Sequence, residues 1–358
     1  MIMPGRTLYT AEQLPVFQNR IFHSDEEARN CARGDVVLAQ DSGTGLVSNR
    51  AFRPELMTYD ADYHNEQGLS AIFQTHLQNV SDIILEHFHG SLIEVGCGKG
   101  HFLETLQALG FEITGLDPAY EGSNPAIVKQ YFDAKSGLTG DGIILRHVLE
   151  HVQHPVSFLS KIRDANGGRG RIYIEVPCFD WICDRRAWFD IFYEHVNYFR
   201  LSDFTRMFGM VTEMGRIFNG QYLYVVADLA TLRLPAFEEA ERLEFPARFL
   251  DSVNRYAAEL GIRKCAPAAV WGAASKGVIF ALFMSRAGAE VDMVIDINPA
   301  KQGKFLPVTA LQVQSPEAAM KSLAPDAEIF VMNGNYLEEV RALTENRFHY
   351  IGVDNETI

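Results

Sequence analysis

The sequence predicts an α/β protein in which a doubly wound sheet is followed by a second, Rossmann-like α/β domain and preceded by a small N-terminal cap. Two stretches predict this architecture. In the first, an apolar run at 92–95 precedes three glycines, an amphipathic helix and a further apolar run that ends in Asp117. In the second, the run 268–271 leads into a glycine-containing turn, an apolar helix and a strand that ends in Asp296. Because strand, glycine turn, helix, strand and acid occur twice in the same order, we expect two such units.

Composition limits the class of protein. The 358 residues, of which 47% are apolar, are enough for two or three domains with real cores. We found neither an apolar run of roughly 18 residues nor a secretory leader pattern, so no membrane association is predicted and a cytoplasmic location is expected. The five cysteines lack C-x-x-C spacing, which indicates reduced thiols, and the net charge of −14 makes nucleic acid an unfavourable partner. A small anionic substrate remains compatible with that charge.

Residues 1–80 show no sustained hydrophobic period and are predicted to form the cap. Tyr59 and Tyr63 precede the first strand of the sheet, where tyrosines can fold over a cofactor or substrate. The alternative is that they anchor a loop against the core.

The spacing of the glycines selects the cofactor. Dinucleotide sites use G-x-G-x-x-G, but here Gly96, Gly98 and Gly100 alternate, so the third glycine comes one residue early and an NAD-dependent oxidoreductase is disfavoured. The stretch E-V-G-C-G-K-G, which begins at Glu94, resembles the first motif of class I S-adenosylmethionine (SAM) methyltransferases. The residues of this stretch expected to bind the cofactor are Glu94, Gly96, Gly98 and Gly100. Asp117 is expected to hold its ribose hydroxyls.

Two further segments follow strands of the predicted sheet. A third strand at 127–132 ends in Asp133, which is either an adenine contact or a solvated loop residue. A buried strand at 142–145 leads into R-H-V-L-E-H-V-Q-H-P, in which three histidines and a glutamate follow the carboxyl end of the strand. Their spacing makes a metal site conceivable. We favour a lining of the pocket between cofactor and acceptor, with His147 beside the cofactor, and predict no metal.

The best catalytic candidate is the pair Glu194 and His195, in the aromatic stretch after the strand 171–176. Histidine suits a base because its ordinary pKa lies near working pH, and a nearby carboxylate would raise its basicity. A structural histidine cushioned by aromatic rings is the alternative. A hairpin with an Asn219-Gly220 turn then closes a seven-stranded sheet.

Residues 230–262 are charged and are predicted to form one or two linker helices, after which the second α/β unit begins. In that unit, Ser275 and Lys276 could lie near phosphates at a helix N-terminus. Alternatively, the unit serves for docking or dimerisation and binds no ligand.

Several motifs together resemble those of the NDP-sugar C-methyltransferases, which act on keto-deoxysugars. They are E-V-G-C-G-K-G at Glu94, L-D-P-A at Leu116, R-H-V-L-E-H-V at Arg146, Y-E-H-V-N-Y-F at Tyr193, W-G-A-A-S-K-G at Trp271, and D-I-N-P-A-K-Q-G-K-F-L-P at Asp296. The resemblance runs from about residue 58 to the C-terminus. It implies a cap at 1–80, a class I SAM methyltransferase domain at 81–229, a linker at 230–262 and a Rossmann-like domain at 263–358, with a sugar nucleotide bound between domains.

The resemblance also implies roles for individual residues. His195 is expected to be the base, Glu194 to orient it, and His151 and Tyr63 to bind or polarise the keto oxygen. Pro118 is expected to bind the cofactor. The substrate is expected to be bound by Tyr193, Asn197 and Lys276. The family usually has an N-terminal zinc site of four cysteines, whereas this cap has only Cys31 and G-T-G-L-V at 43–47, so the cap is predicted to lack zinc.

Two other functions stay open at this point. An O- or N-methyltransferase acting on a sugar nucleotide or another small polar acceptor would use the same residues, because His195 could equally deprotonate a hydroxyl. A non-catalytic module that binds SAM or a nucleotide is disfavoured by the His, Glu and Tyr residues that gather at strand ends. The sequence predicts no oligomeric state.

Overall fold

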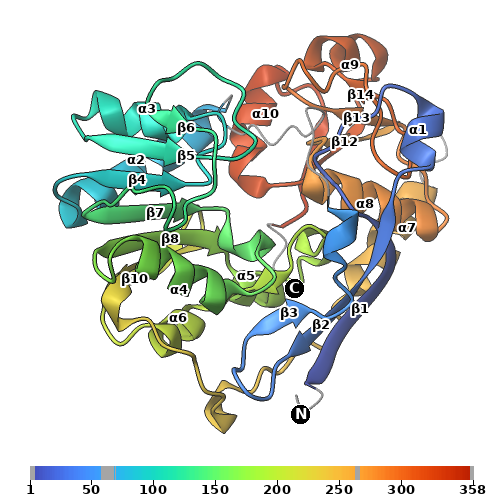
Figure 1. Cartoon of the computed structure of the whole chain (residues 1–358). Helices are drawn as coiled ribbons and strands as arrows, with labels where there is room; N and C mark the ends of the chain where they lie inside the picture. Colours follow the sequence, from blue (N-terminus) through green and yellow to red (C-terminus); the bar gives the residue numbers. More distant parts are fainter. Residues whose placement is uncertain (1–4, 58–67, 69, 263–266, 355–358) are drawn as a thin grey trace.

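The computed structural model describes residues 5–57, 68, 70–262 and 267–354, and these residues form three sheets. Figure 1 shows the largest sheet at the left, a second α/β unit at the upper right and the N-terminal strands at the lower right. Tyr59, Tyr63 and Cys265 lie outside the described residues. No helix among the described residues is both long and apolar enough to cross a membrane.

The largest sheet has seven strands in the order β10-β11-β8-β7-β4-β5-β6. Only β11 runs against the others, because it pairs antiparallel with both β8 and β10 while the remaining pairs are parallel. The strands are β4 (Leu92–Val95), β5 (Ile113–Leu116), β6 (Ile127–Val128), β7 (Gly142–Arg146), β8 (Arg171–Pro177), β10 (Val211–Ile217) and β11 (Tyr222–Asp228). This doubly wound sheet with a final antiparallel pair confirms the predicted fold class.

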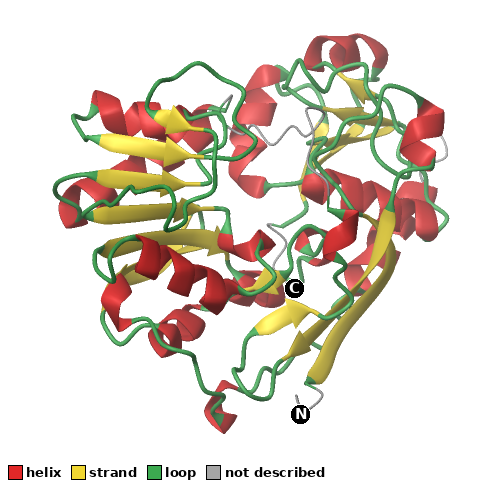
Figure 2. Ribbon diagram, in the orientation of Figure 1, coloured by secondary structure: helices red, strands yellow, loops and turns green. Residues whose placement is uncertain are grey.

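Helices cover both faces of this sheet, as the ribbon view in Figure 2 shows. The first helices, α2 (Ala71–His87) and α3 (His101–Ala108), share one apolar cluster with Ile144, Tyr173 and Val226. Ile143 and Ile172, whose side chains alternate with these along the strands, pack instead with α4 (Pro155–Ala165) and α6 (Leu201–Met207). Two apolar faces on near-continuous apolar strands are what a parallel sheet requires.

The second α/β unit has a five-stranded parallel sheet in the order β14-β13-β12-β15-β16. Its strands are β12 (Ala268–Trp271), β13 (Met293–Ile295), β14 (Val313–Gln314), β15 (Glu328–Val331) and β16 (His349–Gly352). Its helices are α7 (Asp251–Ile262), α8 (Ser275–Arg286), α9 (Pro316–Ser322) and α10 (Leu337–Leu343). The repeat of strand, glycine turn and helix is therefore confirmed.

The N-terminal region is more regular than predicted. It forms an antiparallel sheet of β1 (Arg6–Pro15), β2 (Arg33–Gln40) and β3 (Val47–Asn49), with α1 (Asp25–Arg29) after β1. The fourth strand, β9 (Asn197–Tyr198), comes from the aromatic stretch that contains His195, and it pairs with β3. The cap and the candidate catalytic segment are thus parts of one sheet. The domain boundaries stay predictions, although α2 continues across residue 80.

Two local predictions were wrong. The third strand covers only Ile127–Val128 and not 127–132, because it is the edge of the sheet and pairs only with β5. The first half of the linker is not helical, since 232–250 contains only the 3₁₀ turn η5 (Glu239–Glu241) before α7 begins. Pro235 and Pro246 interrupt this stretch, and prolines are poorly tolerated inside helices.

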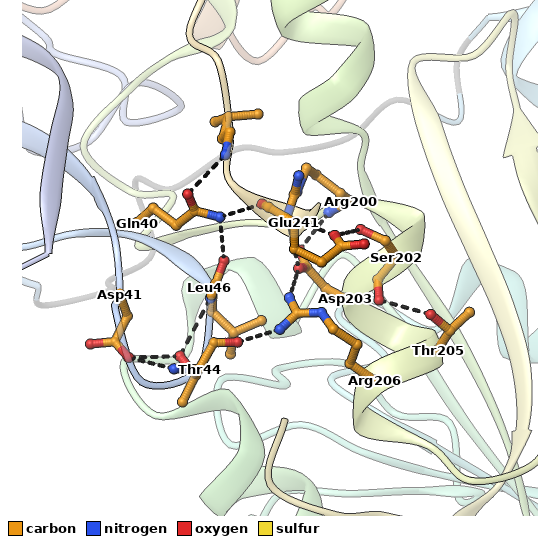
Figure 3. A network of polar contacts seen from close by, with 12 residues as sticks. Gln40, Asp41, Thr44, Leu46, Arg200, Ser202, Asp203, Thr205, Arg206 and Glu241 are labelled. Atoms are coloured by element: carbon orange, nitrogen blue, oxygen red, sulfur yellow. Dashed lines mark hydrogen bonds and ion pairs between the residues drawn. The ribbon is translucent and has the colours of Figure 1, made fainter. Parts of the chain in front are cut away.

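Polar contacts hold the extended linker against both the cap and helix α6 (Figure 3). The Gln40 side chain donates to the carbonyl of Glu241 at 2.8 Å and accepts from the Leu243 amide at 2.9 Å. Arg206 of α6 pairs with buried Asp203 and also donates to the carbonyl of Thr44 in the cap. These contacts tie the cap to the elements that carry His195.

Candidate active site

A cavity of about 2140 Å³ lies between the carboxyl ends of the parallel strands of the seven-stranded sheet and those of the five-stranded sheet. On one side it is lined by the residues that follow β4, β5 and β7, and on the other by those that follow β12, β13 and β15. Ligands of open α/β sheets bind at this edge of the strands. The two repeated units thus face one shared space.

The glycine turn after β4 forms part of this lining, and its backbone explains the glycines. Gly98 has φ +54° and a Cβ added there would meet no atom within 4 Å, so the turn at this residue faces open space. At Gly100, with φ +88°, a Cβ would lie 2.4 Å from the Ile127 side chain. The Gly98 amide donates to the Asp117 carboxylate at 2.9 Å, which braces that acid at the tip of β5. Pro118 follows it and also lines the cavity.

Glu94 is the most perturbed acid near this turn. It is buried, it lines the cavity, and burial raises its pKa to about 7, although the nearby Arg146 guanidinium opposes the shift. Its Oε2 atom has no hydrogen-bond partner among the described residues. A cationic group of a ligand would satisfy this atom.

His147 is held more tightly than the sequence indicated. Its φ is +52°, and its ring nitrogens lie 3.3 Å from Glu150 and 3.0 Å from Glu175. Burial alone would lower its pKa, but the hydrogen bonds to the two glutamates raise the pKa of His147 to about 9. The ring lines the cavity as an imidazolium between two carboxylates.

Glu175 is a central residue that sequence reasoning missed. It is fully buried and accepts from Tyr173 at 2.9 Å and from His76 at 3.0 Å. Arg146 lies 3.3 Å away and helps to hold the pKa of Glu175 well below its usual range, although burial acts in the opposite direction. The residue lies in the middle of an apolar strand, where a charge could have been noticed, but its partners come from distant elements.

His195 lies in the wall of the cavity with little exposure. Its ring centroid is 4.0 Å from that of Phe192 and 5.0 Å from that of His151. Burial, followed by the nearby His151, His147 and Lys276, lowers the pKa of His195 well below its ordinary value. This direction is opposite to the raised basicity expected from Glu194, because desolvation disfavours the charged ring.

Glu194 serves a different neighbour from the one expected. Its carboxylate accepts from the backbone amide of Gln18 at 2.6 Å and contacts the amide of Asn19 at 3.4 Å. Its backbone carbonyl accepts from Nδ1 of His151 at 2.9 Å. The residue therefore joins the cap to this segment and orients His151 through its main chain.

Tyr193 and Asn197 do not line the cavity, in contrast to the predicted substrate contacts. The Tyr193 hydroxyl accepts from the Arg53 amide at 2.8 Å, and its buried ring lies where Gly34 leaves room. The Asn197 amide donates to the carbonyls of Leu149 and Val152. Both side chains hold the loop in place, because a buried loop must satisfy its backbone groups. Tyr63 lies outside the described residues.

Lys276 lines the cavity from the second α/β unit, and Asp133 lines it from the unit of the seven-stranded sheet. Lys276, at the start of α8, lies 3.2 Å from the Asp190 carboxylate and donates to the Gln221 side chain at 3.0 Å. Asp133 accepts from the Lys135 amide at 2.8 Å within its own loop. Asp190, which lines the cavity, and Gln221, which does not, are polar partners of Lys276 that sequence patterns did not single out.

Comparison with known proteins agrees with this arrangement. Residues 44–210 match a family model described as a methyltransferase domain, and residues 257–352 match one described as a C-methyltransferase C-terminal domain. The C-methyltransferase NovU of Streptomyces niveus is 24% identical over 305 residues, which are 74% of this chain and 72% of that protein.

Solved structures resemble parts of the chain. The PH0226 protein of Pyrococcus horikoshii OT3 is 11% identical, with 48% of this chain and 99% of that chain covered and a TM-score of 0.34. The plantazolicin methyltransferase BpumL is 19% identical, with a TM-score of 0.25. That match covers 31% of this chain and 48% of BpumL, so this chain spans about half of that protein.

The first family match covers the seven-stranded sheet up to residue 210, just before β10, and the second covers most of the second unit. The larger sheet has the strand order and glycine turn that suit a SAM site. We conclude that the chain is a SAM-dependent methyltransferase, in which a methyltransferase domain is followed by a region similar to a C-methyltransferase C-terminal domain.

Proposed function

We propose that this enzyme transfers the methyl group of SAM to a carbon beside a ketone, in a keto-deoxysugar linked to a nucleoside diphosphate. One observation supports this proposal more than any other: two glycine turns from two α/β units open into one cavity, with His151 and His195 in its wall. Its volume of about 2140 Å³ exceeds the roughly 300–1,000 Å³ of a pocket for one small molecule. A cofactor and a second large ligand therefore have room together.

The cofactor is assigned to the side of the seven-stranded sheet. Glu94 would accept the SAM ammonium group, Gly98 would let the backbone approach the methionine part, and Asp117 would hold the ribose. Asp133 and His147 would lie along the same side. Each of these residues lines the cavity.

The nucleotide is assigned to the second unit. Lys276 lies in the first turn of the 12-residue helix α8, where positive charge and free amides favour a diphosphate. On nucleotide binding, Lys276 would exchange its present partner, Asp190, for the more highly charged phosphates. The sequence motifs of the second unit, which resemble those of the NDP-sugar C-methyltransferases, support this assignment.

The chemistry requires a base, because a carbon next to a ketone attacks SAM only after a proton leaves. His195 would take that proton, since burial keeps its ring neutral and leaves one nitrogen lone pair. His151 already donates from Nδ1 to a carbonyl, so it must carry a second proton on Nε2 to stabilise the enolate oxygen. The carbanion then attacks the methyl group in line, with the reacting atoms held about 3 Å apart.

The first experiment is calorimetric titration with S-adenosylhomocysteine (SAH), followed by thermal-shift screening of dTDP-, UDP-, GDP- and CDP-sugars in its presence. We expect micromolar SAH binding and stabilisation by one nucleotide class. Binding of SAH with no response to any sugar nucleotide would remove the proposed acceptor.

A second experiment separates C-methylation from O- or N-methylation. The responding keto-sugar is incubated in deuterium oxide with enzyme and SAH, so that no methyl group is available. We expect deuterium to enter at the carbon beside the ketone, because the base acts before transfer. Methyl transfer from SAM without such exchange would favour a hydroxyl or amine acceptor.

A further inference from the structure

Three cavity-lining side chains form a compact group of metal-ligand type: Glu150, His151 and His195. One carboxylate oxygen and one ring nitrogen from each histidine all lie within 4.8 Å of one another. Glu150 belongs to the 3₁₀ turn η2 (Leu149–His151), and His195 comes from the loop just before β9. Two different segments thus bring these donors to one point.

The tautomer of His151 suits a ligand. Its Nδ1 lies 2.9 Å from the carbonyl oxygen of Glu194, and a carbonyl can only accept, so Nδ1 carries the hydrogen. The lone pair of the neutral ring is then on Nε2. Histidines that bind metals are commonly fixed in this way, by donating the other ring hydrogen to a backbone carbonyl.

The carboxylate of Glu150 is oriented by a hydrogen bond from the ring of His147. Its Oε1 atom lies 3.3 Å from Nδ1 of His147, whose other nitrogen lies 3.0 Å from Glu175. Glu150 itself is almost completely buried. The carboxylate is therefore held in place by a chain of buried polar groups rather than by solvent.

Two atoms of the group lack a partner. Within the part of the chain that the structure describes, Oε2 of Glu150 and Nδ1 of His195 are buried and make no hydrogen bond. Buried polar atoms left without partners are rare in folded proteins and cost free energy. A cation among the three side chains would satisfy the carboxylate and a nitrogen lone pair together.

We propose that Glu150, His151 and His195 bind a borderline divalent cation of the Zn²⁺ and Co²⁺ type at the wall of the cavity. Two imidazoles and one carboxylate suit such ions, whereas Mg²⁺ and Ca²⁺ prefer oxygen ligands. Three protein ligands leave further coordination positions open toward the cavity.

The expected consequence for activity rests on the proposed function. A neutral imidazole has one lone pair, so His195 cannot bind a cation and accept the substrate proton at the same time. The cation therefore inhibits methyl transfer, and a chelator restores it. Binding without inhibition would argue against His195 as the base, but it would leave the cation site intact.

The binding test needs no substrate. Protein treated with a chelator and desalted is titrated with Co²⁺, followed by visible absorption, and then with Zn²⁺ as a competitor and Mg²⁺ as the oxygen-preferring control. We expect about one equivalent of Co²⁺ to bind, to be displaced by Zn²⁺ and to be unaffected by Mg²⁺. The variants E150Q and H151Q should weaken binding by at least about tenfold, because each removes one ligand.

Two histidine variants serve as controls. His154 lies just beyond η2 and is outside the ligand group, so H154Q should bind as the original chain does. A second group, Glu86, His87 and Glu213, lies at the surface, and H87Q removes its histidine. The proposal fails if Co²⁺ does not bind at millimolar concentration, or if binding is lost in H87Q but kept in H151Q. SAH titration of E150Q and H151Q checks that both variants are folded.

Discussion

Replacement of Glu94 by glutamine should stabilise the enzyme at high pH and weaken cofactor binding. Glu94 is buried, and desolvation raises its pKa from 4.5 to about 7. The folded state therefore holds a proton that the unfolded chain releases near pH 4.5. Below pH 4.5 both states are protonated and Glu94 costs nothing, and as the pH rises to about 7 the stability falls. The full cost is about 3.5 kcal/mol, at about 1.4 kcal/mol per pKa unit.

The assay compares the melting temperatures of E94Q and the original chain between pH 5 and pH 8. About 2.5 kcal/mol of the cost appears within this range, which corresponds to about 5–10 °C for a domain of this size. The melting temperature of E94Q should therefore exceed that of the original chain by about 5–10 °C more at pH 8 than at pH 5. Glu112, an exposed glutamate before β5, provides the control variant E112Q, for which no such pH-dependent gain is expected.

The same variant tests the cofactor role. If Glu94 accepts the ammonium group, E94Q should bind SAH at least about tenfold more weakly, because a charge-assisted hydrogen bond is replaced by a neutral one. The original chain should also release protons when SAH binds at pH 7, measured by calorimetry in buffers of different ionisation enthalpy. A melting difference that is the same at pH 5 and pH 8 would refute the argument from burial.

Four further predictions concern other parts of the molecule. G98A and G168A should each lose about 1–2 kcal/mol of stability, because both glycines have a positive φ and an added Cβ would meet no atom within 4 Å. Only G98A should also lose SAH affinity, and G168A should bind SAH normally. H195N should lower turnover by about 10²–10⁴-fold while SAH titration gives nearly the original affinity; retained turnover would disprove the base role. D203A should lower the unfolding free energy by about 3–5 kcal/mol, measured by denaturant titration, because two arginines lose a buried partner. E194Q should keep turnover while E194A loses it, since the amide oxygen can still accept the cap amides; a large loss in E194Q would restore a role for its charge.

The parts of the fold that were predicted correctly are encoded locally. The first strand of each α/β unit is a short apolar run followed at once by a glycine turn and a helix, at 92–108 and at 268–286. The hairpin of β10 and β11 was likewise visible, because Asn219 and Gly220 both adopt the positive φ that its turn requires. Such patterns depend on neighbours in the sequence and need no knowledge of distant contacts.

The wrong predictions involve contacts between distant residues. The stretch 232–250 has many glutamates, which favour helix, but the Gln40 side chain binds its backbone in an extended form. Similarly, β9 pairs with β3 across about 150 residues of sequence, which no local pattern reveals. Beside that pairing, Tyr193 and Asn197 support the loop through hydrogen bonds to Arg53, Leu149 and Val152.

The pair Glu194 and His195 illustrates why adjacent residues need not act together. Tyr193 and Glu194 form a turn, which the His195 amide closes by donating to the Phe192 carbonyl at 3.3 Å. Both residues line the cavity, but the Glu194 carboxylate accepts from the Gln18 amide of the cap, whereas the His195 ring lies beside His151. Glu150, from another segment, is the carboxylate that shares a ligand group with His195. The chemistry of His195 is therefore set by residues that the chain brings from η2, and Glu194 contributes by fixing the position of the segment.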